Sequence, residues 1–356
     1  MSTTSSYHIA NGQIIGPNGQ PFVVKGLAVL DSEMSTTSPA SIIAQFPGIN
    51  SINLAVGADG NGYATAQSNA AIINYVNDAT SKGLVVTISD YVPGQPQVRS
   101  GGDLQASLNW YATLAKAFAG NPNVWWTTEN EVGGNLGPME QGVYNAIRGA
   151  GNNGLIFMEA QYGNATSTSG LDPSIYANMT GIGWNIHAYP WEFNTGSTNQ
   201  SDYDNTLKSA VSRFQNFAHS ADGVMPVLMG EGGNSTSGNS AAVDDRIVNG
   251  KFAVTQAITD VAGVSGGTTG YLMWLHDWHG YPGDADTLVN ANGTLTDYGQ
   301  QVAAAMASGN PPPLQPPPPT GPLPPASPDG TQITTAAGSP IIDSAGNAWT
   351  LVQSAS

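Results

Sequence analysis

Two glutamates lie directly after short apolar runs of the sequence. Glu131 follows the run Val124–Glu129, and Glu231 follows a run that ends at Met229. When a carboxylic acid and a carboxylate lie close together, one can protonate the leaving oxygen of a glycosidic bond while the other attacks the anomeric carbon. The proximity of two such groups also separates their pKa values, so that one stays protonated while the other is ionised.

The elements that must position these glutamates alternate between short apolar runs and helical patterns. The apolar runs predict strands buried on both faces, as in a parallel sheet. Eight such strands are predicted: Phe22–Val29, Ser51–Val56, Leu84–Ser89, Val124–Glu129, Leu155–Glu159, Gly181–Ile186, Val224–Met229 and Gly270–Trp274. Helices are predicted between them, over residues 38–46, 67–82, 103–120 (with Asp103 as the cap), a short one from 172, 202–220, 241–261 and 296–306.

This alternation predicts an α/β fold, a (β/α)₈ (TIM) barrel. The main rival is an open doubly wound sheet, which is disfavoured because no glycine-rich phosphate-binding motif follows the first strand. In a barrel, strands four and seven face each other across the mouth, so Glu131 and Glu231 are expected to approach one another. The spacing of Ile14, Gly19 and Phe22 predicts a β-hairpin before the first strand.

The composition changes abruptly near the C-terminus. Residues 309–329 are proline-rich, which predicts a semi-rigid linker, with a ligand for a proline-binding domain as the alternative. Residues 330–356 repeat the N-terminal strand, glycine turn and strand, with Ile341, Gly346 and Trp349 at the positions of Ile14, Gly19 and Phe22. We therefore predict a catalytic domain over 1–308, a linker over 309–329 and a partial, truncated β module over 330–356.

The charge balance restricts the classes of partner. The net charge is −16, and only nine residues are Lys or Arg, which argues against binding to nucleic acid or to anionic membranes. A neutral polysaccharide suffers no such repulsion. The chain has no cysteine and no apolar run long enough to insert into a membrane. Its polar start lacks the apolar region of a signal peptide, and we interpret the chain as a secreted, extracellular monomer whose signal has been removed.

The motifs at the strand ends resemble those of glycoside hydrolase family 5, the cellulase and mannanase family of the retaining (β/α)₈ clan. The resemblance spans residues 8–308, and the matching motifs are Asn130-Glu131, Gly230-Glu231-Gly232, His187-x-Tyr189 and Trp274. It implies that Glu131 is the acid/base and Glu231 the nucleophile of a double displacement.

The same resemblance implies roles in substrate binding for four neighbours of the glutamates. Asn130 would bond the sugar 2-hydroxyl, and Tyr189 would orient the nucleophile. His187 would position and polarise the centre, and Trp274 would form the floor of the glycone subsite. Packing in the core is the alternative role for Trp274.

Two positions depart from the family pattern. The family usually has an arginine near the end of the second strand, where this chain has Asn53, and often a histidine after the third, where it has Asp90. The missing arginine normally supports the charge of the nucleophile, so this chain is expected to handle that charge differently. We retain Asn53 and Asp90 as candidate substrate-binding residues.

Further candidates come from the residues themselves. Tyr91, Trp191 and Trp278 fall in loops at the predicted catalytic face, where aromatic rings can stack on sugars, although structural packing is equally compatible. Glu129 is interpreted either as a buried partner of Glu131 or as a structural carboxylate, and Glu159 as a residue that could line the site. His187, His276 and His279 do not have the spacing of a known metal motif, so neither a metal nor a cofactor is expected.

The sequence therefore predicts a retaining, endo-acting β-glycosidase that hydrolyses a β-linked polysaccharide, with endo-β-1,4-glucanase (cellulase) as the favoured activity. Three alternatives stay open. The same machinery could act on β-mannan or xylan. The barrel could bind glycan without cleaving it, with Asn53 and Asp90 marking lost catalytic support. The C-terminal repeat could carry a structural or adhesive role.

Overall fold

The computed structural model describes residues 6–57, 68–91, 97–192, 197–234, 246–277 and 286–308, together with the backbone of 341–342 and 348–349. The chain divides into two compact units, Met1–Gln315 and Pro316–Ser356. In the second unit, strands β15 (Ile341–Ile342) and β16 (Ala348–Trp349) pair antiparallel. The predicted linker, Gly346 and most of the predicted C-terminal module lie outside the described residues.

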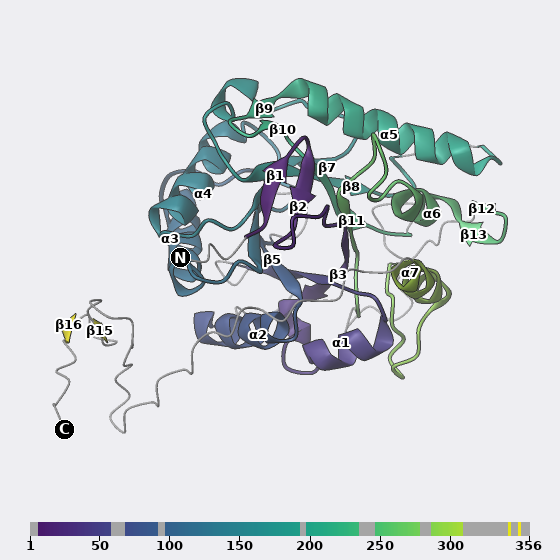
Figure 1. The fold of residues 1–356 in the computed structure, drawn as a ribbon, viewed down its shortest axis with the longest axis horizontal. Helices are drawn as coiled ribbons and strands as arrows, with labels where there is room; N and C mark the ends of the chain where they lie inside the picture. The colour runs from purple at the N-terminus through teal and green to yellow at the C-terminus, as the bar shows by residue number, and fades with distance from the viewer. Residues whose placement is uncertain are drawn as a thin grey trace. The chain divides into compact units, whose positions relative to one another are not determined.

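The first unit is built around a closed barrel of eight parallel strands. In order around the barrel they are β3 (Val24–Leu30), β4 (Ser51–Val56), β5 (Val85–Asp90), β6 (Val124–Glu129), β7 (Ile156–Asn164), β8 (Ile182–Ala188), β11 (Val227–Gly232) and β14 (Gly270–Met273). The pairing of β14 with β3 closes the ring. Figure 1 shows the strands at the centre with the helices outside them. The predicted (β/α)₈ barrel is thus confirmed.

Helices connect successive strands on the outside of the barrel. They are α1 (Pro39–Gln45), α2 (Asn69–Ser81), α3 (Gly101–Ala117), α4 (Gly137–Gly149), α5 (Gln200–Phe217), α6 (Ala253–Asp260) and α7 (Asp297–Ala307). Short 3₁₀ turns, η1 (Asp31–Glu33) and η2 (Pro173–Ile175), follow β3 and β7. The side chains of Ser38, Ser68 and Thr296 accept backbone N–H groups and so cap the helices α1, α2 and α7.

Three helix predictions need correction. Helix α4 was not among the predicted helices, although Pro138 lies in its first turn. Helix α3 starts at Gly101, so Asp103 lies in the first turn and is not the cap. The helix predicted over 241–261 begins only at Ala253 within the described residues.

A small hairpin lies within the stretch 241–261 that was predicted as a helix. Strands β12 (Ile247–Val248) and β13 (Lys251–Phe252) pair antiparallel across Asn249 and Gly250. Both turn residues have positive φ, 52° and 77°. An Asn-Gly pair of this conformation favours a two-residue hairpin over a helix, because both residues tolerate the left-handed region.

The end of the barrel at which the strands begin, called the lower end below, is filled by apolar side chains. The N-terminal hairpin, β1 (His8–Ala10) and β2 (Gln13–Ile15), lies across this end and confirms the predicted hairpin. Its buried Ile14 belongs to a cluster with Phe22 and Trp125, whose rings meet edge to face at 5.8 Å. A second antiparallel pair, β9 (His219–Ser220) and β10 (Gly223–Val224), follows α5. The hairpin therefore plugs the end of the barrel opposite the predicted catalytic glutamates.

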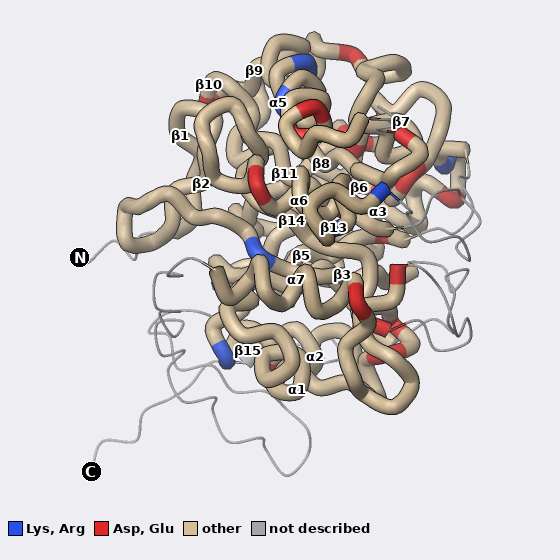
Figure 2. Tube along the Cα trace, turned by 90° about the vertical axis from the view of Figure 1, so that its right-hand side faces the viewer, with Lys and Arg blue, Asp and Glu red and all other residues tan. Residues whose placement is uncertain are grey.

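The chain as a whole is acidic, with 25 Asp and Glu against nine Lys and Arg. Asp and Glu outnumber Lys and Arg along the trace in Figure 2. Among the described residues, no helix has the length and hydropathy needed to cross a membrane.

The plug generates the first prediction. Replacing Ile14 with Ala should lower the free energy of unfolding by about 2–5 kcal/mol, because the buried side chain leaves a cavity beneath the barrel. The neighbouring exposed Gln13→Ala is the matched control and should change little. Urea denaturation followed by tryptophan fluorescence measures both. Equal stability of the two variants would show that the hairpin does not contribute to the core.

Candidate active site

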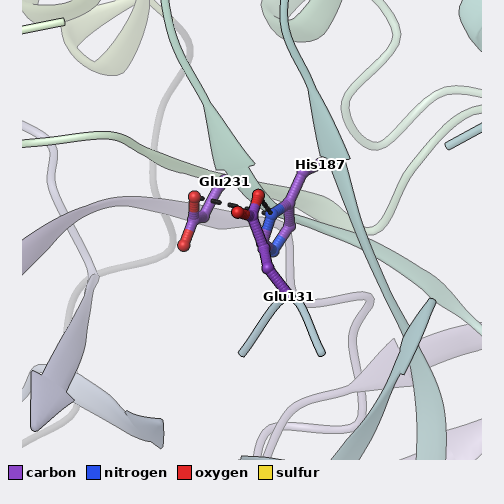
Figure 3. Close-up of side chains that lie close together, drawn as sticks. All are labelled: Glu131, His187 and Glu231. Carbon is purple, nitrogen blue, oxygen red and sulfur yellow. Dashed lines mark hydrogen bonds and ion pairs between the residues drawn. The ribbon is translucent and has the colours of Figure 1, made fainter. Parts of the chain in front are cut away.

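Three strand ends bring Glu131, His187 and Glu231 together. Strand β6 ends at Glu129, and Glu131 then adopts a left-handed conformation with φ of 50°. His187 lies near the end of β8, and Glu231 near the end of β11, directly beside it in the parallel register. Figure 3 shows the three side chains pointing toward one another. A non-glycine residue held at positive φ is often found at functional sites, because the surrounding structure must compensate the strain.

The imidazole of His187 joins the two carboxylates. Its Nδ1 lies 2.8 Å from Glu131 Oε1 and 3.4 Å from Glu231 Oε2. One carboxylate oxygen of each glutamate and the ring nitrogen all lie within 4.8 Å of one another. Retaining glycosidases hold their two carboxyl groups about 5–5.5 Å apart, whereas inverting enzymes separate them by about 6.5–9.5 Å. The separation of at most 4.8 Å between an oxygen of Glu131 and an oxygen of Glu231 is closer to the retaining than to the inverting range. That chemistry needs no metal, and we assign none to the cluster.

Tyr189 fixes the orientation of Glu231. Its hydroxyl donates a 2.9 Å hydrogen bond to Oε2 of Glu231. The other oxygen, Oε1, is buried and has no hydrogen-bond partner among the described residues. One oxygen of Glu231 is therefore anchored while the lone pairs of the other are free for chemistry.

The protonation of the cluster departs from that of free side chains. Burial raises the pKa of Glu231, as do the nearby carboxylates of Glu131 and Glu159, while His187 and the Tyr189 hydroxyl act in the opposite direction. Burial alone would lower the pKa of His187, but the surrounding glutamates raise it well above its ordinary value. The ring therefore tends to carry a positive charge.

Glu159 lies behind His187, fully buried. Its Oε1 is 3.0 Å from Nε2 of the ring, and its other oxygen accepts a hydrogen bond from Asn185. The sequence suggested only that Glu159 could line the site. Asn185 was missed, although it precedes His187 by two residues and period-two alternation places both on the same face of β8.

Asp90 and Glu129 belong to a separate buried group. Both carboxylates contact the guanidinium of Arg99, and Ser107 on α3 donates a 2.8 Å hydrogen bond to Asp90. These contacts favour the structural interpretation of Glu129 and a structural role for Asp90 in place of sugar binding. Glu129 and Glu131 do not share a strand face, because β6 ends at Glu129 and the chain turns at Glu131.

Two aromatic stacks lie just beyond strand ends, at the same end of the barrel as the glutamates. Trp274 is only 3% exposed and stacks on Tyr91, with ring centroids 5.2 Å apart. Trp191 is 41% exposed and stacks on Tyr189 at 4.3 Å with nearly parallel planes. A sugar can use an exposed ring as a platform, so Trp191 presents a stacking surface beside the glutamates. Trp278 lies outside the described residues.

The remaining polar candidates are buried. Asn130 is buried next to Glu131, and its backbone N–H donates to the carbonyl of Asp90. Asn53 on β4 is buried, and its Oδ1 has no partner among the described residues.

Glu192 was not singled out from the sequence. Burial and the charge of Glu131 contribute to raising its pKa to about 8, against the opposing effect of His187.

Gly163 makes room for the imidazole of His187. Strand β7 extends past its predicted end at Glu159, with a register shift, so that Asn164 pairs with His187. Gly163 has φ of 67°, and a Cβ added there would overlap the His187 ring. The sequence contained no direct signal for this contact, because it depends on the bulge in β7.

A parallel barrel with two glutamates at the ends of its fourth and seventh strands has the architecture of a (β/α)₈ glycoside hydrolase. The family model described as Cellulase (glycosyl hydrolase family 5) matches residues 15–261, more than half of the chain. The chain therefore belongs to glycosyl hydrolase family 5 and is a glycosidase. No curated protein matches it in sequence.

Solved structures of the same fold include mannanases and an endoglucanase. The catalytic domain of a mannanase from Streptomyces sp. SirexAA-E is 17% identical, with a TM-score of 0.60 and coverage of 86% of this chain and 91% of that one. The β-mannanase from Thermomonospora fusca is 17% identical (TM-score 0.58, 86% and 97% covered). The catalytic domain of Thermobifida fusca endoglucanase Cel5A (E5) is 16% identical (TM-score 0.61, 86% and 98% covered). At these identities the likeness shows the fold.

The packing of Gly163 generates a prediction. Gly163→Ala should lower kcat by about 100-fold, because a displacement of His187 by about 1 Å disturbs both glutamates. Gly151→Ala is the matched control, since Gly151 has a similar φ of 79° but open space around it. Steady-state kinetics on the preferred polymer compares the two. Equal activity of the two variants would show that His187 tolerates displacement.

A second prediction concerns the pH profile. A nucleophilic Glu231 must be ionised, so activity should rise with pH through its raised pKa, and the acid limb of kcat/KM should lie above the ordinary value of 4.5. Tyr189→Phe removes a donor that stabilises the ionised form and should move this limb to still higher pH. Tyr111→Phe, which loses a buried hydroxyl that donates to Thr127, should leave the limb in place. An unmoved limb in Tyr189→Phe would contradict this role for the tyrosine.

Proposed function

We propose that this protein is a retaining endo-β-1,4-glucanase, with Glu231 as nucleophile and Glu131 as acid/base. The observation that carries the proposal is the placement of both carboxylates on one imidazole nitrogen, with an oxygen of each within 4.8 Å of the other. That separation suits attack on an anomeric carbon by one group while the other protonates the leaving oxygen.

The first half of the reaction forms a glycosyl-enzyme intermediate. Oε1 of Glu231, which has no hydrogen-bond partner among the described residues, attacks the anomeric carbon. The bond to the leaving sugar breaks as Glu131 transfers its proton to the glycosidic oxygen. Tyr189 holds the other oxygen of Glu231 and keeps the carboxylate aimed during the attack.

The second half releases the sugar. Glu131, now ionised, takes a proton from water, and the resulting hydroxide equivalent attacks the anomeric carbon. The bond to Glu231 breaks, and both carboxyl groups return to their starting state. Glu131 is 24% exposed at its side chain, which gives water access to it, while Glu231 is almost fully buried.

The substrate is proposed to be a neutral β-linked polysaccharide. Trp191 offers an exposed aromatic face for a sugar ring. The role of Trp274 as floor of the glycone position rests on the family resemblance, since this ring is only 3% exposed and stacks on Tyr91. The net charge of −16 does not repel an uncharged polymer and disfavours nucleic acid. We further propose that the protein acts outside the cell as a monomer. A β-mannanase is the second candidate, because β-mannanases and an endoglucanase share the fold with similar TM-scores.

The experiment is a panel of carboxymethylcellulose, glucomannan and xylan, assayed for reducing sugar with the native protein, Glu131→Gln and Glu231→Gln. Each substitution should lower the rate by about 10²–10⁴-fold, because Glu131→Gln removes the proton donor and Glu231→Gln removes the attacking carboxylate. Glu129→Gln is the matched control, since that glutamate contacts Arg99 and should retain activity when folded.

The outcomes separate the candidates. Preference for carboxymethylcellulose supports the glucanase, and preference for glucomannan over carboxymethylcellulose supports the mannanase. Activity that survives in both glutamine variants would contradict the assigned roles. A folded native protein that binds a polymer but releases no sugar would favour a glycan-binding barrel.

A further inference from the structure

A third glutamate, Glu159, completes a chain of charged groups through His187. Its carboxylate lies on the opposite side of the ring from the catalytic pair, with Oε1 3.0 Å from Nε2. The Nδ1 atom faces Glu131 at 2.8 Å and Glu231 at 3.4 Å. Both ring nitrogens therefore contact carboxylates at hydrogen-bond or ion-pair distance, and the histidine lies between three acids.

The number of protons on the ring follows from this arrangement. A neutral imidazole has one N–H donor and one lone pair, and a lone pair facing an ionised carboxylate is repelled. Only the doubly protonated ring can donate toward Glu131 and Glu159 at the same time. Nδ1 lies 3.4 Å from the carboxylate proposed as the ionised nucleophile, Glu231, and Nε2 lies 3.0 Å from Glu159, so an imidazolium suits both ion pairs.

The charge balance of the barrel interior points the same way. Glu159 and Glu231 are buried, and a buried carboxylate without a cationic partner is costly. Among the described residues, the ion pairs bring no lysine or arginine to Glu131, Glu159 or Glu231. His187 is the basic side chain that contacts all three. The second-strand position, Asn53, is uncharged.

We propose that Glu159 is a positioning residue that keeps His187 doubly protonated, and that the resulting imidazolium is the shared cation of both catalytic glutamates. The inference rests on the proposed function for the roles of Glu131 and Glu231. It adds Glu159, which is buried on the Nε2 side of the ring, away from the Nδ1 atom that faces the catalytic pair, as the residue that sets the charge of the ring.

The packing around Glu159 fixes its direction. Asn185 donates to the second carboxylate oxygen, and the backbone N–H of Glu159 donates to Thr128 Oγ1 at 3.0 Å. A Cβ on Gly230 would overlap Oδ1 of Asn185, so the glycine leaves space for the amide that holds Glu159. Glu159 is thus held toward Nε2 by contacts from β6 and β8, with space made by β11.

The effect on pH dependence follows from the groups that face the ring. They come from four parts of the barrel mouth: Glu131 after β6, Glu159 on β7, Glu231 on β11 and Glu192 after β8. Burial opposes the charge on His187, and the carboxylates raise the pKa of the ring above 6.5 in spite of it. The proton is therefore lost only as pH rises through this raised pKa. Without the Glu159 carboxylate, the proton should be lost at a lower pH.

The test is ¹⁵N NMR of the histidine rings in the full chain, which has five histidines, with His187 assigned by the loss of its signals in His187→Gln. In the native protein, both ring nitrogens of His187 should have protonated shifts at pH values above 6.5, where a free histidine is neutral. In Glu159→Gln, the midpoint of the transition should fall by about one pH unit or more, which is about tenfold in proton affinity.

Glu33→Gln is the matched control. Glu33 is a fully buried glutamate whose Oε2 lies 3.3 Å from Nδ1 of a different histidine, His276. Its substitution removes a buried carboxyl group that also lies beside a histidine, and it should leave the His187 transition unchanged. A shift of equal size in this control would show that any buried charge moves the transition and would overturn the specific role of Glu159.

Two outcomes in the main experiment would also overturn the proposal. One is a neutral His187 ring in the native protein near pH 7, which is measured on the native protein once His187→Gln has assigned its signals. The other is an unchanged midpoint in folded Glu159→Gln. Because NMR reads the ring without substrate, these results are independent of whether the protein cleaves a polysaccharide.

Activity gives a second readout if the proposed function holds. In Glu159→Gln, the alkaline limb of kcat/KM should move to lower pH, because the His187 ring loses its second proton at lower pH when the Glu159 carboxylate is absent. Glu159→Asp, which restores the negative charge, should recover part of the shift. A merely structural role for Glu159 would lower the rate at every pH without moving the limb.

Discussion

The contact of one imidazole with three carboxylates is the constraint on which the catalytic face depends. Ionised glutamates are costly to bury, and His187 makes their burial tolerable by placing Nδ1 between Glu131 and Glu231 and Nε2 against Glu159. The bulge in β7 places Gly163 against the ring, where a larger residue would overlap it, and Glu131 reaches the ring from a positive-φ conformation.

The buried charged groups and the main apolar packing inside the barrel lie at opposite ends of its strands. At the lower end, the N-terminal hairpin and an apolar cluster that includes Ile14, Phe22 and Trp125 exclude water. At the end where the strands finish, Ala28, Ala55 and Trp274 form a smaller apolar cluster, beside the buried polar residues His187 and Glu231. A rigid, well-packed lower half can hold the strand ends in fixed register, so the glutamates need no large rearrangement to reach each other.

The strands were predictable because each is a short apolar run buried on both faces, and this signal is local. Where local patterns compete, the prediction failed. The turn of Asn249 and Gly250 interrupted an apparently continuous helix with a hairpin, since both residues adopt positive φ. The extension of β7 beyond Glu159 was missed, because a bulge that aligns Asn164 with His187 is set by the neighbouring strand and leaves no periodic pattern.

By itself, the sequence determined the alternation of strands and helices and the positions of Glu131, His187, Tyr189 and Glu231 at strand ends. It did so because a parallel barrel gathers the carboxyl ends of all its strands on one face. The tertiary structure decided which buried polar groups meet. It turned Asp90 and Glu129 toward Arg99, and it placed Glu159 behind His187. The contacts of Glu129 with Arg99 and of Glu159 with His187 join residues of different elements that meet only in the folded barrel, and no local pattern of residues encodes them.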